Sequence, residues 1–271
     1  IIKYFELLNY KVLVLCPKKL RSNWTIYHAA NNSELNILVE DRFNYTVLSH
    51  TDLSRDTGYS GDINLETLNR GNYDLVVIDE SHNFRNNTKG KRDEDGNVIK
   101  KSRYERLMED IIKKGIPTRV LLLSATPVNT DLKDLRNQIN FIVEDKDSAF
   151  SQTLGIDSIK QTLTTAQKEF TLWAKKKQHH SNELLENLNS SFFTLLDGLT
   201  IARSRQHIKK YYQETIAELG GFPERLKPVS LFSHIDLEDN FLDYDEINEQ
   251  ISDYQLSLFN PSNYVLEEYQ H

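Results

Sequence analysis

Two adjacent carboxylates, Asp79 and Glu80, end an unbroken aliphatic run and are followed by Ser81 and His82. The run, residues 75–78, has the composition of a strand buried on both faces of a parallel sheet. Ligands of open α/β sheets bind beyond the carboxyl ends of the strands. There Asp79 could hold a Mg²⁺ ion through its waters, and Glu80 could orient and deprotonate a water in phosphoryl transfer. The alternative is a strand followed by an acidic loop.

A second strand-like run, Arg119 followed by four aliphatic residues, ends on the small residues Ser124, Ala125 and Thr126, before Pro127. It also has the composition of a buried strand. One predicted helix separates the two runs, so we expect a βαβ unit with parallel strands. The carboxylates and these small residues would then meet at one edge of the sheet.

The separating helix is predicted within residues 102–114. Ser102 and Glu105 form a capping-box pattern at its start, and apolar side chains recur at helical spacing through its middle. Gly115 and Pro117 then provide the stop signals.

A third buried strand is predicted at residues 12–16, closed by Pro17 and followed by a helix through Trp24. Lys18 and Lys19 open this helix, where cations and backbone N–H groups can converge on a phosphate. The alternative for the two lysines is a solvated basic turn. We expect Trp24 in the core.

Two more short strands are predicted at residues 36–39 and 45–48. Ser49 and His50 follow the second of them. They could contact phosphate, although capping of the next helix is the favoured role.

The second half of the chain has helical patterns and no further strand-like runs until residue 229. Helices are predicted at residues 131–139, with Thr130 as N-cap, and then across 158–177 and 182–202. An extended segment is predicted at 229–232, and an acidic helix at 239–251.

The composition sets limits on the class of protein. The chain has 271 residues and one cysteine, which excludes an internal disulfide framework and fits a reducing cytoplasm. No aliphatic run is long enough to span a membrane. Residues 231–271 contain ten acidic residues and no Lys or Arg, so the net charge of −7 arises in this tail and the remainder is mildly basic.

Asp79–His82 and Ser124–Pro127, in this order and spacing, resemble motifs II and III of superfamily two helicases and translocases. Residues 12–24 resemble motif Ia of the Swi/Snf-related translocases within that superfamily. Asn83–Asn86 resembles the family's extension of motif II, and residues 124–142 resemble its extension of motif III. The last extension favours DNA over RNA.

The resemblance implies a RecA-like parallel sheet with flanking helices, ATP and Mg²⁺ as ligands, and ATP-driven movement on duplex DNA. It implies that Asp79 binds the metal, that Glu80 is the general base, and that His82 links the ATP site to a second helicase lobe of the same protein. Three residues would couple nucleotide state to DNA contact, namely Ser124, Ala125 and Thr126. Five residues would contact nucleic acid, namely Lys18, Lys19, Ser49, His50 and Arg85.

The resemblance also implies a domain organisation. Residues 1–150 would be part of the first RecA-like lobe, 151–228 a helical protrusion, and 229–271 an acidic linker towards the second lobe. The sequence contains no G-x-x-x-x-G-K-[ST] phosphate loop. We therefore expect the chain alone to hydrolyse ATP negligibly, although it would come from an ATPase.

Two alternatives remain at this stage. The chain could be a non-catalytic DNA- or protein-binding module that keeps the helicase fold without the phosphate loop. It could also belong to an RNA helicase, which RNA rather than duplex DNA would stimulate.

Overall fold

The computed structural model describes residues 1–129, 131–176, 180–202, 204–218, 220–222, 226, 227, 229, 247 and 250. Among these residues, no helix combines the length and the apolar composition needed to cross a membrane.

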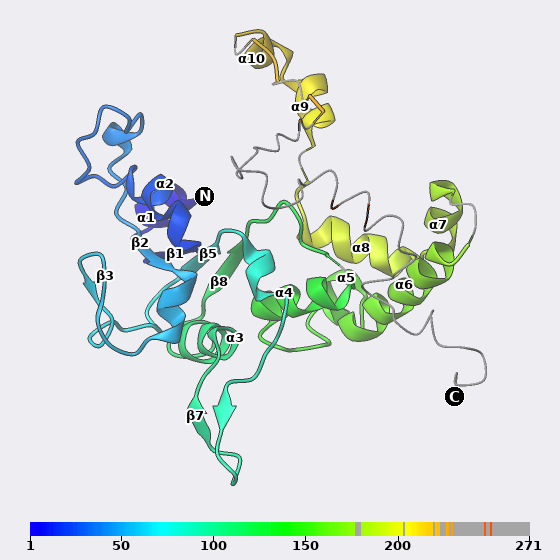
Figure 1. Ribbon diagram of the computed structural model, residues 1–271, viewed down its shortest axis with the longest axis horizontal. Helices are drawn as coiled ribbons and strands as arrows, with labels where there is room; N and C mark the ends of the chain where they lie inside the picture. The colour runs from blue at the N-terminus through cyan, green and yellow to red at the C-terminus, as the bar shows by residue number, and fades with distance from the viewer. Residues whose placement is uncertain are drawn as a thin grey trace. The chain divides into compact units, whose positions relative to one another are not determined.

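A sheet of four parallel strands, in the order β2-β1-β5-β8, forms the centre of the first part of the chain (Figure 1). The strands are β1 (Val12–Cys16), β2 (Thr46–Ser49), β5 (Leu75–Ile78) and β8 (Arg119–Leu122). Helices flank the sheet, and a helical region follows β8. This arrangement confirms the predicted fold class, a RecA-like α/β sheet followed by a mostly α-helical region.

The two central strands, β1 and β5, are buried on both faces, as their continuous aliphatic composition predicts. Successive side chains of a strand point to opposite faces, so each strand contributes to two cores. One core contains Leu13, Leu15, Val76 and Ile78, together with helical residues such as Ile111. The other core contains Val12, Val14, Cys16, Leu75 and Val77.

The helix between β5 and β8 begins where the capping box predicts. Ser102 accepts a hydrogen bond from the backbone N–H of Glu105, whose carboxylate accepts one from the N–H of Ser102. The helix starts as α3 (Arg103–Arg106) and continues as a π-helical turn, η5 (Leu107–Ile112). The π turn was not predicted, because hydrophobic spacing does not separate it from an α-helix.

Two glycines bring the start of β5 close to the segment that leads into β8. A Cβ atom on Gly71 would lie 2.2 Å from the carbonyl oxygen of Lys114, and one on Gly115 would lie 2.3 Å from that of Gly71. Gly115 also has φ +95°, which L-residues rarely adopt. The predicted stop at Gly115 is therefore also a close crossing that aligns the two strands.

The segment after β1 is helical, as predicted, and the segment before it is also helical. Helix α1 (Ile2–Leu7) precedes the strand, and η1 (Lys18–Leu20) and α2 (Arg21–Thr25) follow it. The predicted strand at residues 36–39 is wrong, because this stretch forms turns and the start of η2 (Val39–Asp41). Strand β2 then leads into the 3₁₀ helix η3 (His50–Ser54).

Two small antiparallel pairs lie outside the main sheet. The first joins β3 (Tyr59–Ser60) to β4 (Ile63–Asn64), before β5. The second joins β6 (Lys91–Arg92) to β7 (Val98–Lys100), on either side of the Asp95–Gly96 turn. It follows η4 (Ser81–Phe84) and is exposed.

A helical core follows β8. It is formed by α4 (Lys133–Val143), α5 (Ser151–Leu154), α6 (Ile159–Ala174), α7 (Ser181–Asn187) and α8 (Ser190–Leu199). The single helix predicted at 182–202 is instead two helices, because Leu188 adopts an extended conformation and Asn189 caps the second one. Figure 1 shows α4 next to β8 and α6 and α8 beyond it.

The chain divides into two compact units, Ile1–Ile201 and Ala202–His271. The predicted domain boundary at residue 150 falls between α4 and α5, inside the first unit. In the second unit, Ser204 caps α9 (Arg205–Tyr211), which is followed by α10 (Gln213–Glu218). The predicted N-cap, Thr130, lies outside the described residues. So do the segments predicted at 229–232 and 239–251, apart from residues 229, 247 and 250.

Candidate functional site

The carboxyl edge of the sheet brings together the residues that the sequence singled out. Lys18 and Lys19 follow β1, Asp79 and Glu80 follow β5, and Ser124 lies two residues after β8. The chain runs from β1 to β2 on one side and later returns to β5 on the other side of β1. The strand order therefore reverses between β1 and β5, which is where open α/β sheets bind ligands.

The Asp79 carboxylate is held by two hydrogen bonds. Its Oδ1 accepts from the backbone N–H of Glu80 at 3.0 Å, and its Oδ2 accepts from the indole N–H of Trp24 at 2.8 Å. The backbone N–H of Asp79 also donates to the carbonyl of Leu15 at 2.8 Å. Trp24 was expected in the core. It is half-buried, and its ring N–H reaches the candidate metal ligand.

Glu80 has φ +50° and ψ +50°, a left-handed conformation that a non-glycine residue adopts at a cost of about 1 to 3 kcal/mol. Such strained residues cluster at functional sites. The conformation turns the chain from β5 directly into η4, so the Glu80 side chain is half-buried at the end of the strand.

His82 connects the two predicted motifs. Its Nδ1 lies 3.2 Å from Oε2 of Glu80 and 3.2 Å from Oγ of Ser124. Ser124 Oγ also accepts a hydrogen bond from the backbone N–H of Thr126 at 3.1 Å, whereas the Ala125 side chain is exposed. The structure thus brings Glu80, His82 and Ser124 into one contact, from segments 42 residues apart.

Ser81 is 1% exposed and ties the end of β5 to both β8 and α4. Its backbone N–H donates to the carbonyl of Leu123 at 2.9 Å, and its hydroxyl donates to Oε1 of Gln138 at 2.8 Å. Gln138 in turn donates to the carbonyl of Pro127 at 2.6 Å. Sequence reasoning missed Gln138. The sequence did contain a signal for it, because Gln138 is a polar residue beside Ile139, which belongs to the apolar stripe of the predicted helix.

The motif II extension is tied to α4 through its backbone rather than through its charge. The side-chain amide of Asn137 donates to the backbone carbonyl of Arg85 at 2.6 Å. The backbone carbonyl of Asn137 accepts from the hydroxyl of Tyr104 at 3.0 Å. Burial raises the pKa of Tyr104 to about 12. The Arg85 side chain is half-buried, and its predicted contact with nucleic acid stays a prediction.

Ser49 and His50 are each 3% exposed, so their side chains have little surface to offer a nucleic acid. Direct phosphate contact by these two residues, one of the predicted options, does not fit this burial. The favoured option fits better, because the N–H of Ser49 donates to Oδ2 of Asp52 at 2.8 Å in a capping box. Burial lowers the pKa of His50 to about 4, although hydrogen bonding to the backbone of Leu15 and Asp79 acts in the opposite direction.

Asp52 is a buried carboxylate, 4% exposed, that accepts hydrogen bonds from several donors. It accepts hydrogen bonds from Ser49, Ser60 and Arg55, and Arg21 lies 3.9 Å away. Burial raises the pKa of Asp52, but the hydrogen bonds from Ser60 and Arg55 outweigh burial and lower it. Asp52 therefore stays ionised, and it joins the segments after β1 and β2.

Two segments carry exposed cations. Lys18 and Lys19 are exposed at the start of η1, whereas Arg21 is turned inward to Ser60. The β6–β7 hairpin carries three more exposed cations, namely Lys91, Arg92 and Lys100. Lys18 and Lys19 are available for anions, which is the role predicted for them, whereas Arg92 is paired with Glu105.

The carboxylates fit one kind of metal site only. Within the described part of the chain, no three His, Cys, Asp or Glu side chains lie close enough together to hold a metal ion by themselves. Asp79 retains a free lone pair on each oxygen, because each accepts one hydrogen bond. One carboxylate suits a Mg²⁺ ion whose other ligands are waters and substrate phosphates.

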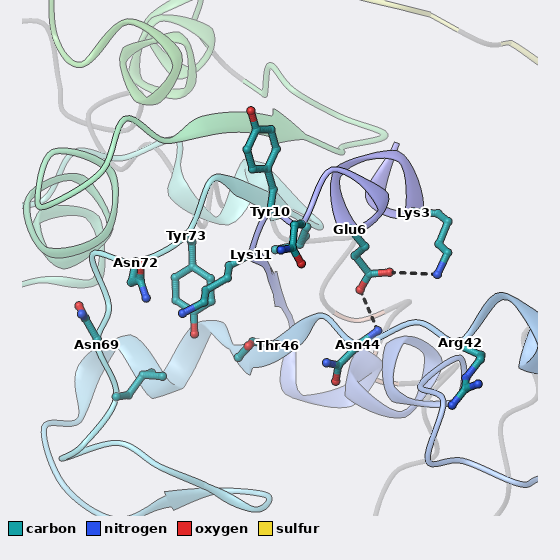
Figure 2. A pocket seen from close by; sticks show the side chains of 13 residues that line it. Lys3, Glu6, Tyr10, Lys11, Arg42, Asn44, Thr46, Asn69, Asn72 and Tyr73 are labelled. Carbon is teal, nitrogen blue, oxygen red and sulfur yellow. Dashed lines mark hydrogen bonds and ion pairs between the residues drawn. The ribbon is translucent and has the colours of Figure 1, made fainter.

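A large polar cleft lies at the opposite, amino edge of the sheet. It has a volume of about 680 Å³ and is lined by polar side chains that include Lys3, Glu6, Lys11, Arg42 and Asn44 (Figure 2). None of the predicted site residues lines it. A large polar cleft and the predicted chemistry are therefore at different ends of the strands.

A scan of the chain against models of known protein families found no match, and a search of curated proteins found no significant similarity either. The geometry at the carboxyl edge and the motifs that lie there are therefore the basis for proposing a function.

Proposed function

We propose that this chain supplies the Asp79–Glu80 half of an ATP-hydrolysing site in a protein that moves on duplex DNA, as its resemblance to Swi/Snf-related translocases implies. The observation that carries the proposal is the contact of His82 with both Glu80 and Ser124, each at 3.2 Å. Two motifs predicted separately meet through one ring nitrogen at the edge where α/β sheets bind ligands.

Each residue has a distinct role in this proposal. Glu80 orients and deprotonates the attacking water, and Asp79 accepts the metal. The Mg²⁺ ion, when bound with the nucleotide, neutralises charge that develops on the phosphates. His82 carries the state of Glu80 to Ser124, from which the chain continues through Ala125 and Thr126 towards α4.

The proposed DNA contact relies on cations rather than on shape. Lys18 and Lys19 are exposed beside the switch point, and the β6–β7 hairpin adds further exposed cations. Such side chains neutralise phosphates and give salt-dependent binding without sequence preference. A reducing, cytoplasmic compartment is part of the proposal, because Cys16 is the single cysteine and is buried as a free thiol.

The test is ATP hydrolysis by a longer form of the protein, extended at both ends, with and without duplex DNA. We expect DNA to stimulate turnover, and Glu80→Gln to lower it about 10² to 10⁴-fold, as removal of a general base does. Glu186→Gln is the matched control, because Glu186 is exposed on α7, away from the predicted motifs. Full turnover in Glu80→Gln would contradict the proposal.

A second candidate function is a binding module without catalysis, and the absence of a phosphate-loop motif from this sequence favours it. The same assay separates the two. If the protein hydrolyses no ATP in any condition but still binds duplex DNA, the result favours the binding module. Stimulation by RNA but not by duplex DNA indicates an RNA helicase.

A further inference from the structure

Trp24 and Asp79 are 55 residues apart in the sequence, and the indole N–H of Trp24 donates to Oδ2 of Asp79 at 2.8 Å. Trp24 lies on α2, the short helix after β1, whereas Asp79 directly follows the neighbouring strand β5. The bond therefore crosses the switch point between the two central strands.

The indole is itself held in place. The hydroxyl of Tyr45 donates to the backbone carbonyl of Trp24, and the two rings meet edge to face with centroids 6.2 Å apart. Tyr45 is 5% exposed and also packs edge to face against His28 and Phe43. This aromatic cluster fixes the position from which the Trp24 N–H points.

The Asp79 carboxylate is consequently held at both oxygens, with Trp24 on Oδ2 and the Glu80 N–H on Oδ1. Two fixed donors set the plane of the carboxylate, and with it the directions of the remaining lone pairs. A carboxylate that is orientated in advance loses less freedom when it binds a cation.

The chemistry of the donor matters as well as its position. An indole N–H donates, does not accept, and carries no charge at any ordinary pH. It stabilises the ionised carboxylate without neutralising it. A Lys or Arg in the same place would form an ion pair with Asp79 and compete with a divalent cation.

We propose that Trp24 is a positioning residue that orientates Asp79 for a divalent cation. This inference rests on the proposed function, because it takes Asp79 as the metal ligand. It adds a residue to the site from a segment that the predicted chemistry assigned only to DNA contact.

The chain offers an internal control, because Trp24 and Trp173 are its two tryptophans. The indole N–H of Trp173 donates to the carbonyl of His180 at 3.1 Å, within the helical region. Nitrogen-15 labelling of tryptophan should therefore give two indole N–H signals, which Trp24→Phe and Trp173→Phe assign.

The first measurement is the effect of substoichiometric Mn²⁺, a paramagnetic substitute for Mg²⁺, on these two signals in the unmutated chain. We expect the Trp24 signal to broaden and the Trp173 signal to stay sharp. Asp79→Asn should abolish the selective broadening. Equal effects of Mn²⁺ on both signals would overturn the inference, and this result does not depend on whether a Trp24 variant folds.

The second measurement is the affinity for Mn²⁺ by water-proton relaxation. Trp24→Phe keeps an aromatic ring and removes the N–H, and we expect it to weaken binding about tenfold, as loss of an outer-shell partner does. Trp173→Phe should leave the affinity unchanged.

The outcomes separate the inference from the proposed function. If Asp79→Asn weakens Mn²⁺ binding but Trp24→Phe does not, the positioning role of Trp24 is wrong and the metal site stands. If Asp79→Asn leaves Mn²⁺ binding unchanged, Asp79 is not the metal ligand. The positioning role of Trp24 and the proposed role of Asp79 are then both wrong.

Discussion

The two edges of the central sheet are both polar, yet their side chains are held very differently. At the carboxyl edge, the side chains of Asp52, Asp79, Ser81 and His82 each contact residues from other segments of the chain. Their partners come from α2, α4 and the segments after β2 and β8. These side chains therefore have fixed positions.

The amino edge is open by comparison. Of the residues that line its cleft, Asn9, Lys11, Arg42 and Asn44 are exposed. One contact at this edge joins α1 to the segment before β2, where Glu6 accepts from the N–H of Asn44 at 2.7 Å (Figure 2). Lys3 lies 3.9 Å from the same carboxylate.

A set of fixed contacts is stronger evidence for a catalytic site than a cleft is. Catalysis requires groups held in a productive geometry by their neighbours. The carboxyl edge meets this condition without a large cavity, whereas the cleft at the amino edge has volume and polarity but few cross-links. The comparison can be tested by removing one negative charge at each edge, with almost no change of side-chain shape.

The largest effect is expected from Asp52→Asn, at the carboxyl edge. The amide keeps the size of the carboxylate but loses its charge and one of its acceptor oxygens, so the donors Ser49, Ser60 and Arg55 cannot all be satisfied. Buried hydrogen bonds to a charged group contribute about 1.5 to 3 kcal/mol each. We expect the free energy of unfolding to fall by about 3 kcal/mol, measured by urea denaturation.

An Asp52→Asn variant as stable as the unmutated chain would show that the Asp52 contacts are incidental. It would also remove the contrast between the two edges. Asp62→Asn is a suitable control, because Asp62 is exposed in the β3–β4 turn and the same change there should have little effect.

The sequence predicted the four strands of the main sheet and the polar residues that follow them, because both are local properties. An aliphatic run of strand length, such as Leu75–Ile78, predicts burial, and the polar residue after it predicts the edge. The capping box at Ser102 was equally local and is confirmed. The sequence could not supply partners such as Trp24 for Asp79 or Gln138 for Ser81, because hydrophobic periodicity does not specify which side chains meet across elements.

The wrong prediction at residues 36–39 has a local cause. Ile37, Leu38 and Val39 favour a strand, but the side chain of Asn36 bonds to the carbonyl of Asn31 at 3.0 Å and accepts from the N–H of Leu38 at 3.2 Å. Asn side chains offer the backbone an alternative to sheet pairing. Turn chemistry therefore overrode the β-propensity of three consecutive aliphatic residues.

A second, pH-dependent effect is expected from His50, also at the carboxyl edge. Burial lowers its pKa from 6.5 to about 4, so between these values the unfolded chain binds a proton that the folded chain does not. Stability should therefore fall as the pH drops from 6.5 towards 4. The contribution of His50 is small near pH 6.5 and reaches at most about 3 kcal/mol at the acid end of this window, since one pKa unit corresponds to about 1.4 kcal/mol.

The measurement is the free energy of unfolding at several pH values for the unmutated chain and for His50→Phe. The variant keeps an aromatic ring against Phe84, whose ring centroid lies 4.9 Å from that of His50. The Phe side chain has no proton to gain. We expect the stability of the variant to depend less on pH between 4 and 6.5. Identical pH profiles for the two proteins would mean that His50 is not buried as a neutral side chain.

The smallest effect is expected from Glu6→Gln, the counterpart of Asp52→Asn at the amino edge. Gln keeps an oxygen that can accept from the N–H of Asn44, so the change removes mainly the attraction to Lys3. Partly exposed ion pairs contribute about 1 kcal/mol or less, and salt screens them. We expect the free energy of unfolding, measured by urea denaturation, to fall by less than about 1 kcal/mol, and by less still in 0.5 M salt. A loss as large as that of Asp52→Asn would mean that the amino edge is as tightly organised as the carboxyl edge, and its cleft would then have the rigidity that a binding site requires.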